Sequence, residues 1–342
     1  MDFTKRKSTS IAVTARAFSQ NLQLRKEIGE HYQHVKFNET GRLLSGSELV
    51  DFLKGSEAAI ISLEKIDEQL LSQLPELRVI SKYGVGLDNV NFEALVKHDT
   101  KFSWRGGVNR RSVAELTLSF ILLSLRKSAI AHQQLRNGVW KPLVGAQLTG
   151  RTVGIVGCGF IGRDLVHLLK PFGCKLLAHD IVDDKPFHLE HDIEFVSLDE
   201  LITRSDIVTL HVPLNTSTKN IMNASRIQAM KENSLLINTA RGGLVDETAL
   251  KARLKKENMS AAFDVFAEEP AQDLELIHLP SFFSTPHMGG SSQEAVIAMG
   301  RAAYEGLETA LPIREWLEEY PEYKAVSSLQ ASSLVSVSSL QM

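Results

Sequence analysis

The chain has 342 residues, of which 43% are hydrophobic and 23% are charged, and its formal net charge is −3. This length favours two domains over a single core, and the composition is typical of a globular protein. The slightly acidic balance argues against a nucleic-acid partner, because proteins that bind nucleic acid usually present a basic face.

The first hundred residues alternate short apolar runs with helical patterns. Strands are predicted at residues 10–15, 58–62 and 77–83, and helices at residues 19–32 and 67–74. Such alternation predicts βα units that build a parallel sheet. The glycine-rich stretch "GVGLDNVN" then interrupts the pattern.

A single long helix is predicted between Ser112 and Asn137. Ser112 and Glu115 have the spacing of a capping box, and Gly138 is a plausible stop. The most apolar part, residues 116–125, is shorter than the roughly 20 apolar residues that a membrane crossing needs. The segment is therefore interpreted as a buried helix, and no membrane partner is expected.

A second series of βα units follows this helix and predicts a doubly wound parallel sheet. Its strand candidates are residues 152–156, 174–180, 193–196, 206–212, 234–240, 259–266 and 282–287. The serine-rich residues 326–342 are interpreted as a low-complexity tail, from which no function is inferred.

The chain has two cysteines, Cys158 and Cys174. They provide neither a disulfide framework nor a metal-ligand cluster, so no metal is expected. No apolar stretch long enough for a signal sequence follows the basic N-terminus. These features favour a reducing, cytoplasmic setting.

A glycine-rich turn, "VGIVGCGFIG", joins a predicted strand to a predicted helix. Gly157 would allow the tight turn, Gly159 the close approach of a pyrophosphate, and Gly162 the close packing of helix on strand. The amides of Phe160 and Ile161 would open the helix, whose positive end attracts the anion. A glycine pattern alone is a weak signal, but the strand before it and the helix after it favour a dinucleotide-binding turn.

Asp180 ends the next predicted strand, at about the twenty-residue spacing expected for a ribose-binding acid. Its carboxylate would accept hydrogen bonds from the ribose diol and repel a 2′-phosphate, which favours NAD over NADP as the cofactor. The alternative is a structural glycine turn with an unrelated aspartate on the surface.

Three later strands each end in groups suited to acid–base or anion chemistry. Arg241 follows the first of them and His287 follows the last. Asp264 and Glu269 follow the strand between these two. The carboxyl ends of parallel strands meet at the edge where open α/β sheets bind ligands, so these side chains can face one pocket. Each alone has an ordinary explanation as a surface or loop residue, but together they indicate a catalytic site.

Several motifs in the same order resemble the D-isomer-specific 2-hydroxyacid dehydrogenases, and among them the 3-phosphoglycerate dehydrogenases. They are "VGIVGCGFIG", "HVPLNTSTKNIMN", "INTARGGLVDE", "FDVFAEEP" and "TPHMGGSSQEA". The resemblance implies two doubly wound α/β domains, with a Rossmann NAD-binding domain (residues 109–288) inserted into a flavodoxin-like substrate domain (residues 1–108 and 289–325). It also implies an oxidoreductase that transfers a hydride between nicotinamide and a D-2-hydroxy acid or 2-keto acid, and a homodimer.

The resemblance also implies roles for individual residues. Arg241 would bind the substrate carboxylate and polarise the reacting carbonyl, and His287 would exchange a proton with the reacting oxygen. Glu269 would pair with His287 and favour its imidazolium form. Asp264 would hold the nicotinamide carboxamide. Further matches are Pro213, Thr239, Ala240, Gly289 and Gly290 in the cofactor pocket, and Val85 and Gly86 at the substrate carboxylate.

The resemblance leaves the substrate open. In many phosphoglycerate enzymes an arginine helps to bind the phosphate, and the aligned position here holds Ile61. Arg110 and Arg111 could supply cationic contacts, although a solvated face is an equal alternative. The candidates are 3-phosphoglycerate and, alternatively, glyoxylate, hydroxypyruvate or a longer 2-keto acid. A formate dehydrogenase is disfavoured, because that branch carries glutamine where Glu269 stands. An NAD-sensing, corepressor-like binding protein is the alternative from another class.

Overall fold

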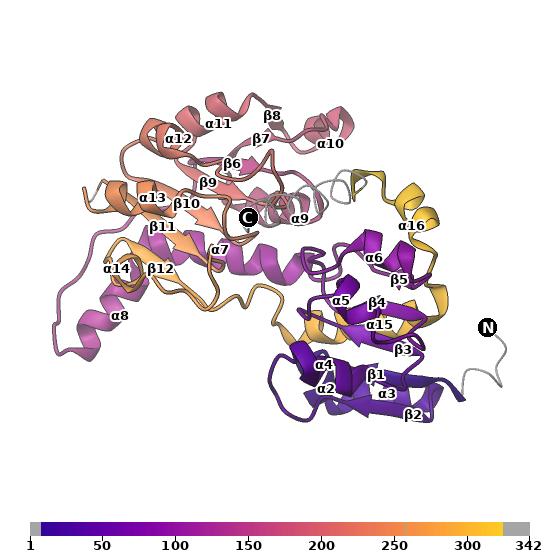
Figure 1. Ribbon diagram of the computed structural model, residues 1–342. Helices are drawn as coiled ribbons and strands as arrows, with labels where there is room; N and C mark the ends of the chain where they lie inside the picture. The colour runs from indigo at the N-terminus through magenta and orange to yellow at the C-terminus, as the bar shows by residue number, and fades with distance from the viewer. Residues whose placement is uncertain (1–7, 257, 324–342) are drawn as a thin grey trace, which may run out of the picture. The chain divides into compact units, whose positions relative to one another are not determined.

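The computed structural model describes residues 8–256 and 258–323, so the expected tail at residues 326–342 lies outside the described residues. The chain divides into two compact units (Figure 1). Unit 1 combines the chain before Arg110 with the chain after Ser291, and unit 2 is the continuous stretch Arg110–Ser291. Each unit is built on one parallel sheet.

Unit 1 contains a five-stranded parallel sheet in the order β2-β1-β3-β4-β5. This is the strand order of flavodoxin-like folds. The strands are β1 (Ser10–Val13), β2 (His34–Phe37), β3 (Ala58–Ile61), β4 (Val79–Lys82) and β5 (Lys101–Ser103). The helices are α2 (Arg16–Gln20), α3 (Leu22–His31), α4 (Gly46–Leu53), α5 (Glu68–Leu71), α6 (Phe92–Lys97), α15 (Gln293–Thr309) and α16 (Ile313–Glu319).

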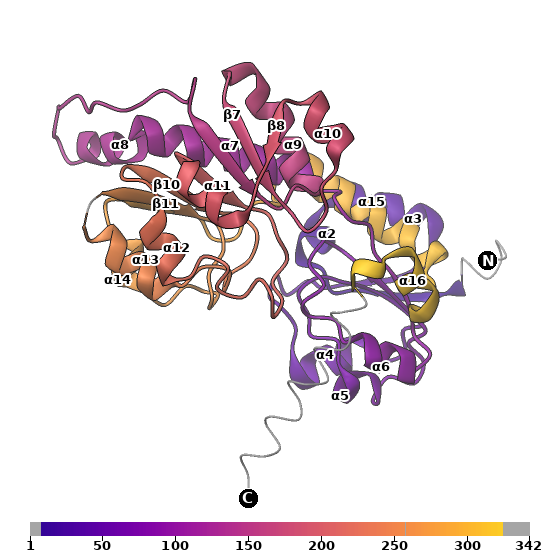
Figure 2. The same ribbon diagram turned by 90° about the horizontal axis from the view of Figure 1, so that it is seen from above.

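Successive strand residues point to opposite sides of this sheet. Each side packs in a separate core, so both faces are covered. Ile61 and Ile80 pack with Trp316 of α16 on one side. Ile60 packs with Met299 of α15 on the other side. α15 lies beside α2 and α3, as both views show (Figures 1 and 2). The C-terminal part of the chain therefore completes the core that the N-terminal part begins.

Unit 2 contains a seven-stranded parallel sheet in the order β12-β11-β10-β9-β6-β7-β8. The order reverses at the neighbours β6 and β9, which is the switch point where open α/β sheets bind ligands. The strands are β6 (Thr152–Val156), β7 (Lys175–His179), β8 (Ile193–Phe195), β9 (Ile207–Leu210), β10 (Ser234–Asn238), β11 (Met259–Phe263) and β12 (Phe282–Ser284). The helices are α7 (Arg110–Arg126), α8 (Ser128–Arg136), α9 (Phe160–Leu169), α10 (Lys185–Glu190), α11 (Leu198–Arg204), α12 (Ala224–Ala229), α13 (Glu247–Leu254) and α14 (Leu274–Ile277).

The two faces of the seven-stranded sheet carry separate cores. α7 and α9 pack on the face that holds Ile155 and Ile237. α11, α12 and α13 cover the face that holds Val156 and Leu236. Hydrophobic strands that are buried on both faces are typical of parallel sheets. The predicted fold class, two doubly wound parallel-sheet α/β domains, is therefore confirmed.

Strands β2 and β5 and helices α4 and α6 of unit 1 are not predicted from the sequence, and one helix boundary is missed. β2 and β5 are short, partly exposed edge strands, so neither has a long apolar run. The predicted helix at residues 19–32 is two helices, α2 and α3. Asn21 separates them and caps α3, because its side chain accepts a hydrogen bond from the amide of Leu24 at 3.0 Å.

The predicted single helix at residues 112–137 is wrong, because the structure divides it into α7 and α8. The break is at Lys127, which adopts a left-handed conformation with a φ of 53°. The segment after α8 returns to this break, where the amide of Ala146 donates to the carbonyl of Leu125 at 2.8 Å. A hydrophobic pattern can run unbroken through such a turn, so the sequence does not reveal it.

The predicted capping box of Ser112 and Glu115 is also wrong. α7 begins at Arg110, two residues earlier, so Ser112 lies within the helix. Its hydroxyl instead donates to the carbonyl of Gly289 at 2.6 Å. Ser112 therefore ties α7 to the loop after β12.

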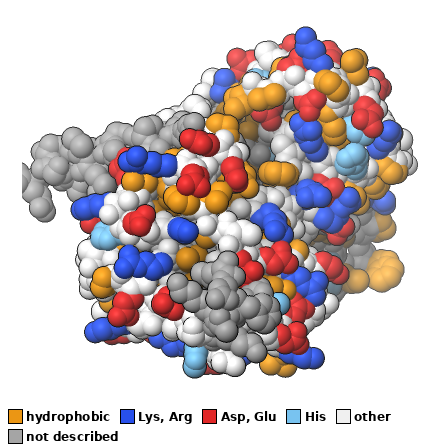
Figure 3. All heavy atoms as spheres, turned by 90° about the vertical axis from the view of Figure 1, so that its right-hand side faces the viewer, with side chains coloured by type: hydrophobic (Ala, Val, Ile, Leu, Met, Phe, Trp, Pro, Cys, Tyr) orange, Lys and Arg blue, Asp and Glu red, His pale blue; other side chains and the backbone are white. Residues whose placement is uncertain are grey.

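Acidic and basic side chains are interspersed on the face drawn in Figure 3. Among the described residues, no helix is both long and apolar enough to cross a membrane. Within the same residues, no group of three or more His, Cys, Asp and Glu side chains is arranged to hold a metal ion.

Candidate active site

The glycine turn follows β6 at the switch point of the seven-stranded sheet. Gly157 has a φ of 96°, and a Cβ added to it would lie 2.6 Å from the carbonyl oxygen of His211. A Cβ on Gly162 would lie 2.2 Å from the carbonyl oxygen of Gly157. These two glycines are therefore required by the packing of the turn itself. A Cβ on Gly159 would meet no atom within 4 Å, so the space beside this residue is open to a ligand.

The amino end of α9 opens directly from this turn. No side chain among the described residues caps the helix, whereas Asp184 caps the neighbouring helix α10. The first amides of α9, those of Phe160 and Ile161, precede the first intrahelical hydrogen bond and can donate to an anion. Together with the open space at Gly159, this cradle fits the pyrophosphate of a dinucleotide.

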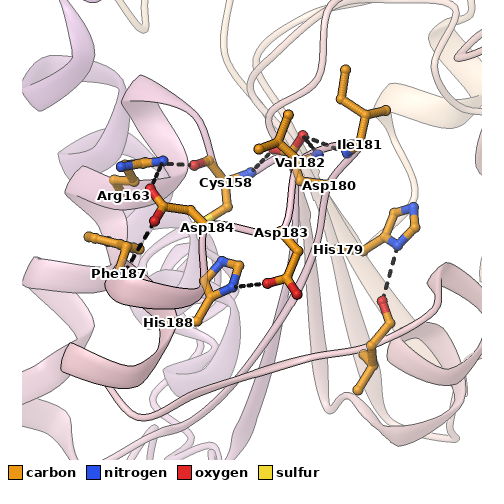
Figure 4. Close-up of polar contacts among 11 residues, drawn as sticks. Cys158, Arg163, His179, Asp180, Ile181, Val182, Asp183, Asp184, Phe187 and His188 are labelled. Atoms are coloured by element: carbon orange, nitrogen blue, oxygen red, sulfur yellow. Dashed lines mark hydrogen bonds and ion pairs between the residues drawn. The ribbon is translucent and has the colours of Figure 1, made fainter.

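Asp180 stands at the carboxyl end of β7, beside the glycine turn (Figure 4). One carboxylate oxygen, Oδ2, accepts a hydrogen bond from the amide of Cys158 at 2.6 Å. The other, Oδ1, accepts from the amide of Ile181 at 2.6 Å. Oδ1 also accepts from the amide of Val182 at 3.4 Å. These bonds fix the orientation of the carboxylate, and Oδ2, which accepts one of them, keeps a further lone pair for a hydroxyl donor.

His287 and Glu269 form a direct pair at the opposite half of the same sheet edge. His287 Nδ1 lies 2.7 Å from Glu269 Oε2, and both side chains are partly exposed to solvent. The second carboxylate oxygen of Glu269, Oε1, accepts from the amide of Phe266 at 3.1 Å. The pair therefore has a fixed orientation, in which Nδ1 is the ring nitrogen that faces the carboxylate.

The loop that carries His287 is held by a buried carboxylate. Asp264 is only 1% exposed, and its two oxygens accept hydrogen bonds from Thr285 Oγ1 at 2.5 Å, Met288 N at 2.8 Å and Gly289 N at 2.7 Å. The backbone amide of His287 also donates to the carbonyl of Asp264 at 2.8 Å. His287 itself has a φ of 50°, an uncommon conformation for a residue with a side chain. Asp264 thus shapes the turn that presents the histidine.

Arg241 follows β10, two strands away from β12. Its guanidinium Nη1 donates to the carbonyl of Ala240 at 2.7 Å. The side chain of Asn238 fastens the bend, because it donates to the carbonyl of Arg241 at 2.7 Å and accepts from the amide of Ala240 at 3.1 Å. A Cβ on Gly242 would lie 1.7 Å from the carbonyl oxygen of Phe266, so this bend packs directly on the loop that holds Glu269.

Comparison with known proteins identifies the family of the chain. Residues 118–289 match the family model described as D-isomer specific 2-hydroxyacid dehydrogenase, NAD binding domain. The chain belongs to this family. A hydroxypyruvate reductase of Thermotoga maritima is 34% identical to it over 76% of this chain and 87% of its own length.

A D-3-phosphoglycerate dehydrogenase of Methanocaldococcus jannaschii is 34% identical over 88% of this chain, which spans only 57% of that relative's length. The solved structure of the TT0316 protein from Thermus thermophilus superposes with a TM-score of 0.76 at 30% identity and covers 90% of this chain and 97% of that one. The 2-hydroxyacid dehydrogenases are NAD-dependent oxidoreductases, so the predicted cofactor, NAD, is confirmed.

The other residues that the sequence proposed for this dehydrogenase lie at the same sheet edge or in unit 1. Thr239 and Ala240 are buried after β10, and the Thr239 hydroxyl lies 2.9 Å from that of Thr117. Pro213 is exposed after β9, Gly289 is buried and Gly290 is partly exposed. Val85 and Gly86 follow β4 in unit 1, where the carbonyl of Val85 accepts from Trp104 Nε1 at 3.1 Å.

Two titratable groups beside the glycine turn are uncharged at neutral pH. Burial lowers the pKa of His211 from its ordinary value of 6.5 to about 3. Burial likewise raises the pKa of the Cys158 thiol to about 11. A buried thiol with a raised pKa is a poor nucleophile.

Asp264→Asn should lower stability and turnover together. An asparagine would turn its NH2 group toward one of the three donors that Asp264 now accepts, leaving that buried donor without a partner. Such a loss costs about 1–3 kcal/mol, so the melting temperature should fall by roughly 2–10 °C. The measurement is thermal unfolding together with kcat. Asp199→Asn is the matched control, because the Asp199 side chain is 77% exposed and pairs with Arg226 at 2.8 Å. An unchanged melting temperature and kcat in Asp264→Asn would contradict the role of this carboxylate.

Proposed function

We propose that the chain interconverts a D-2-hydroxy acid and the corresponding 2-keto acid, with Arg241, Glu269 and His287 as its catalytic residues. The observation that carries the proposal is the His287–Glu269 pair at 2.7 Å, held at the carboxyl edge of the sheet that binds NAD. A histidine paired with a carboxylate is a standard acid–base arrangement, because the carboxylate orients the ring and favours its protonated form.

In the direction of reduction, bound NADH supplies the hydride to the carbonyl carbon of the keto acid. As negative charge develops on the carbonyl oxygen, His287 donates its Nε2 proton to that oxygen, and Glu269 holds the ring in place through Nδ1. The Arg241 guanidinium polarises the same carbonyl and binds the substrate carboxylate, for which its planar fork is suited. In oxidation, His287 accepts the hydroxyl proton. These roles follow from the stabilisation of developing charge in the transition state.

The proposed cofactor contacts follow the edge of the sheet. The pyrophosphate lies at Gly157, Gly159, Phe160, Ile161 and Gly162, and the adenosine ribose at Asp180. The nicotinamide half lies toward Pro213, Thr239, Ala240, Asp264, Gly289 and Gly290. We also propose that the backbone of Val85 and Gly86 receives the substrate carboxylate.

The substrate is proposed to be 3-phosphoglycerate or, as a second candidate, glyoxylate or hydroxypyruvate. The M. jannaschii relative supports the first and the T. maritima relative supports the second. Ile61 favours the second candidate. It is fully buried at the end of β3, so the position where many phosphoglycerate enzymes carry arginine offers no charge here.

The test is NADH consumption with a panel of 2-keto acids that includes glyoxylate, hydroxypyruvate and phosphohydroxypyruvate. We expect turnover with at least one of them. NADH binding without turnover of any 2-keto acid would contradict the proposed activity and favour a binding protein that senses NAD.

We also propose that the chain forms a homodimer through α8 and the segment after it. α8 buries none of its residues, and three nearby apolar side chains are exposed: Leu135 by 52%, Trp140 by 86% and Val144 by 89%. Exposed apolar groups of this kind mark an interaction surface, and a second copy of the chain presents the same surface by symmetry. The free thiols of Cys158 and Cys174 support the proposed cytoplasmic setting.

Trp140→Glu should convert this dimer to a monomer. A charge in the middle of an apolar interface removes one large contact and cannot be solvated there. Light scattering after gel filtration gives the mass directly. Lys141→Glu, on the exposed neighbouring residue, is the matched control and should leave the dimer intact. If wild type is a dimer and Trp140→Glu keeps the same mass, the surface is wrongly assigned.

A further inference from the structure

Arg163 in the first turn of α9 connects the glycine turn with the loop after β7 (Figure 4). Its Nε donates to the carbonyl of Cys158 at 3.1 Å, and its Nη2 donates to Asp184 Oδ2 at 2.6 Å. The guanidinium also lies over the ring of Phe187, at 4.7 Å from the ring centroid. These contacts hold a positive charge beside the loop that begins at Asp180.

Asp184 is the residue that neutralises this charge. It caps α10, because its side chain accepts from the amide of Phe187 at 3.3 Å, and it forms an ion pair with Arg163. The hydrogen bonds from the Phe187 amide and from Arg163 hold the pKa of Asp184 below its ordinary value. The Arg163–Asp184 pair is only partly exposed, with 43% and 29% of the two side chains open to solvent.

The charges around the proposed ribose position are therefore unfavourable for a 2′-phosphate. Asp180 points its carboxylate at the turn, and Asp184 occupies the guanidinium of Arg163. Asp183, between them in sequence, pairs with His188 Nδ1 at 2.9 Å. A phosphate monoester carries close to two negative charges at neutral pH, and arginine is the side chain best suited to bind it. Such a cation, Arg163 of α9, lies beside this loop, but the carboxylate of Asp184 holds it.

We propose that the Arg163–Asp184 ion pair is a second determinant of cofactor choice. The Arg163 guanidinium could bind the 2′-phosphate of NADP, but Asp184 neutralises this guanidinium and so disfavours NADP. The inference rests on the proposed position of the adenosine ribose at Asp180, and it does not involve the acid–base residues. It has a specific consequence. Loss of Asp180 alone removes the ribose contacts without creating a phosphate site. Loss of Asp184 makes the Arg163 guanidinium available to bind a phosphate.

The experiment measures the Kd of NADH and of NADPH by calorimetry, with no substrate present. Asp180→Ala should weaken NADH binding about tenfold, by ~1.4 kcal/mol. It should strengthen NADPH binding only by the loss of one repulsive charge, which is a smaller gain than the one expected from Asp184→Ser. Asp184→Ser should strengthen NADPH binding about tenfold. The double variant should prefer NADPH. Adding Arg163→Met to the double variant should remove the gain, because the cation is then gone.

Serine is chosen at position 184 because it still caps a helix, and Asp184→Asn provides a second variant that removes only the charge. Thermal unfolding without cofactor shows whether each variant is folded. Glu194→Gln is the matched control, because it breaks an exposed ion pair with Arg204 on the same unit and should change neither Kd.

The outcomes separate this inference from the proposed function. If wild type binds neither nucleotide, both the proposed cofactor position and the inference are wrong. If wild type binds NADH and the folded Asp184 variants bind NADPH no better, the inference alone is overturned. The inference is also overturned if the stronger binding of NADPH persists in the variant that lacks Arg163.

Discussion

Replacement of His287 by alanine should lower kcat about 10²–10⁴-fold and leave the Kd of NADH nearly unchanged. This range is the usual contribution of a positioned acid–base group. Without the imidazole, the oxygen that becomes an alkoxide has no proton donor in place, whereas the proposed contacts to the pyrophosphate and the adenosine ribose lie in other loops. Stopped-flow or steady-state measurement of NADH consumption gives kcat, and calorimetry gives the Kd.

His278→Ala is the matched control for this variant. His278 lies in the same unit, is exposed, and bonds only locally, with Nδ1 2.7 Å from the carbonyl of Leu274. Its removal should leave kcat unchanged. Full turnover in His287→Ala, with the control behaving as expected, would remove His287 from the mechanism.

Arg241→Lys should raise KM for the keto acid and lower kcat by roughly 10²–10³-fold. Lysine keeps the positive charge, but a compact ammonium cannot reproduce the two parallel hydrogen bonds that a guanidinium makes to a carboxylate. It also cannot polarise the carbonyl from the same position. The effect should appear in both parameters, because the contact exists in the bound state and strengthens in the transition state.

The matched control for Arg241 is Arg204→Lys. Arg204 lies on α11 and forms exposed ion pairs with Glu194 and Glu200, the second at 2.6 Å. The substitution also exchanges a guanidinium for an ammonium, and it should change neither KM nor kcat. Wild-type values for both parameters in Arg241→Lys would show that the guanidinium fork does not contact the substrate.

Most of the fold could be predicted from the sequence, because buried parallel strands are continuous apolar runs between helical patterns. Strands β6, β9 and β10 coincide with such runs, whereas the edge strand β8 carries the exposed Glu194 between two apolar residues. The errors in helix boundaries have a common cause. A hydrophobic pattern does not show where the backbone of a helix is interrupted. Lys127 turns left-handed between two apolar helical segments, and Asn21 ends one helix while it caps the next.

The candidate site was partly predictable, for a different reason. Loops at the carboxyl ends of successive parallel strands converge, so residues that follow β10, β11 and β12 could be grouped before any coordinates existed. The supporting contacts could not be predicted. Nothing in the sequence shows that Gly242 lies against the carbonyl of Phe266, that Asn238 fastens the Arg241 bend, or that Asp184 holds Arg163. Such contacts depend on tertiary distances between loops.

The placement of α15 on the sheet of unit 1 affects the order in which a growing chain can fold on the ribosome. Unit 2 is synthesised without interruption, so it can close as soon as Ser291 has emerged. Unit 1 cannot be completed until α15 has been synthesised. This helix ends roughly 200 residues after Asn109, which is a delay of about 10–40 s at ordinary rates of translation. During that interval the sheet surface around Ile60 lacks the part of its cover that α15 provides. We expect the nascent protein to depend on chaperones mainly in this period.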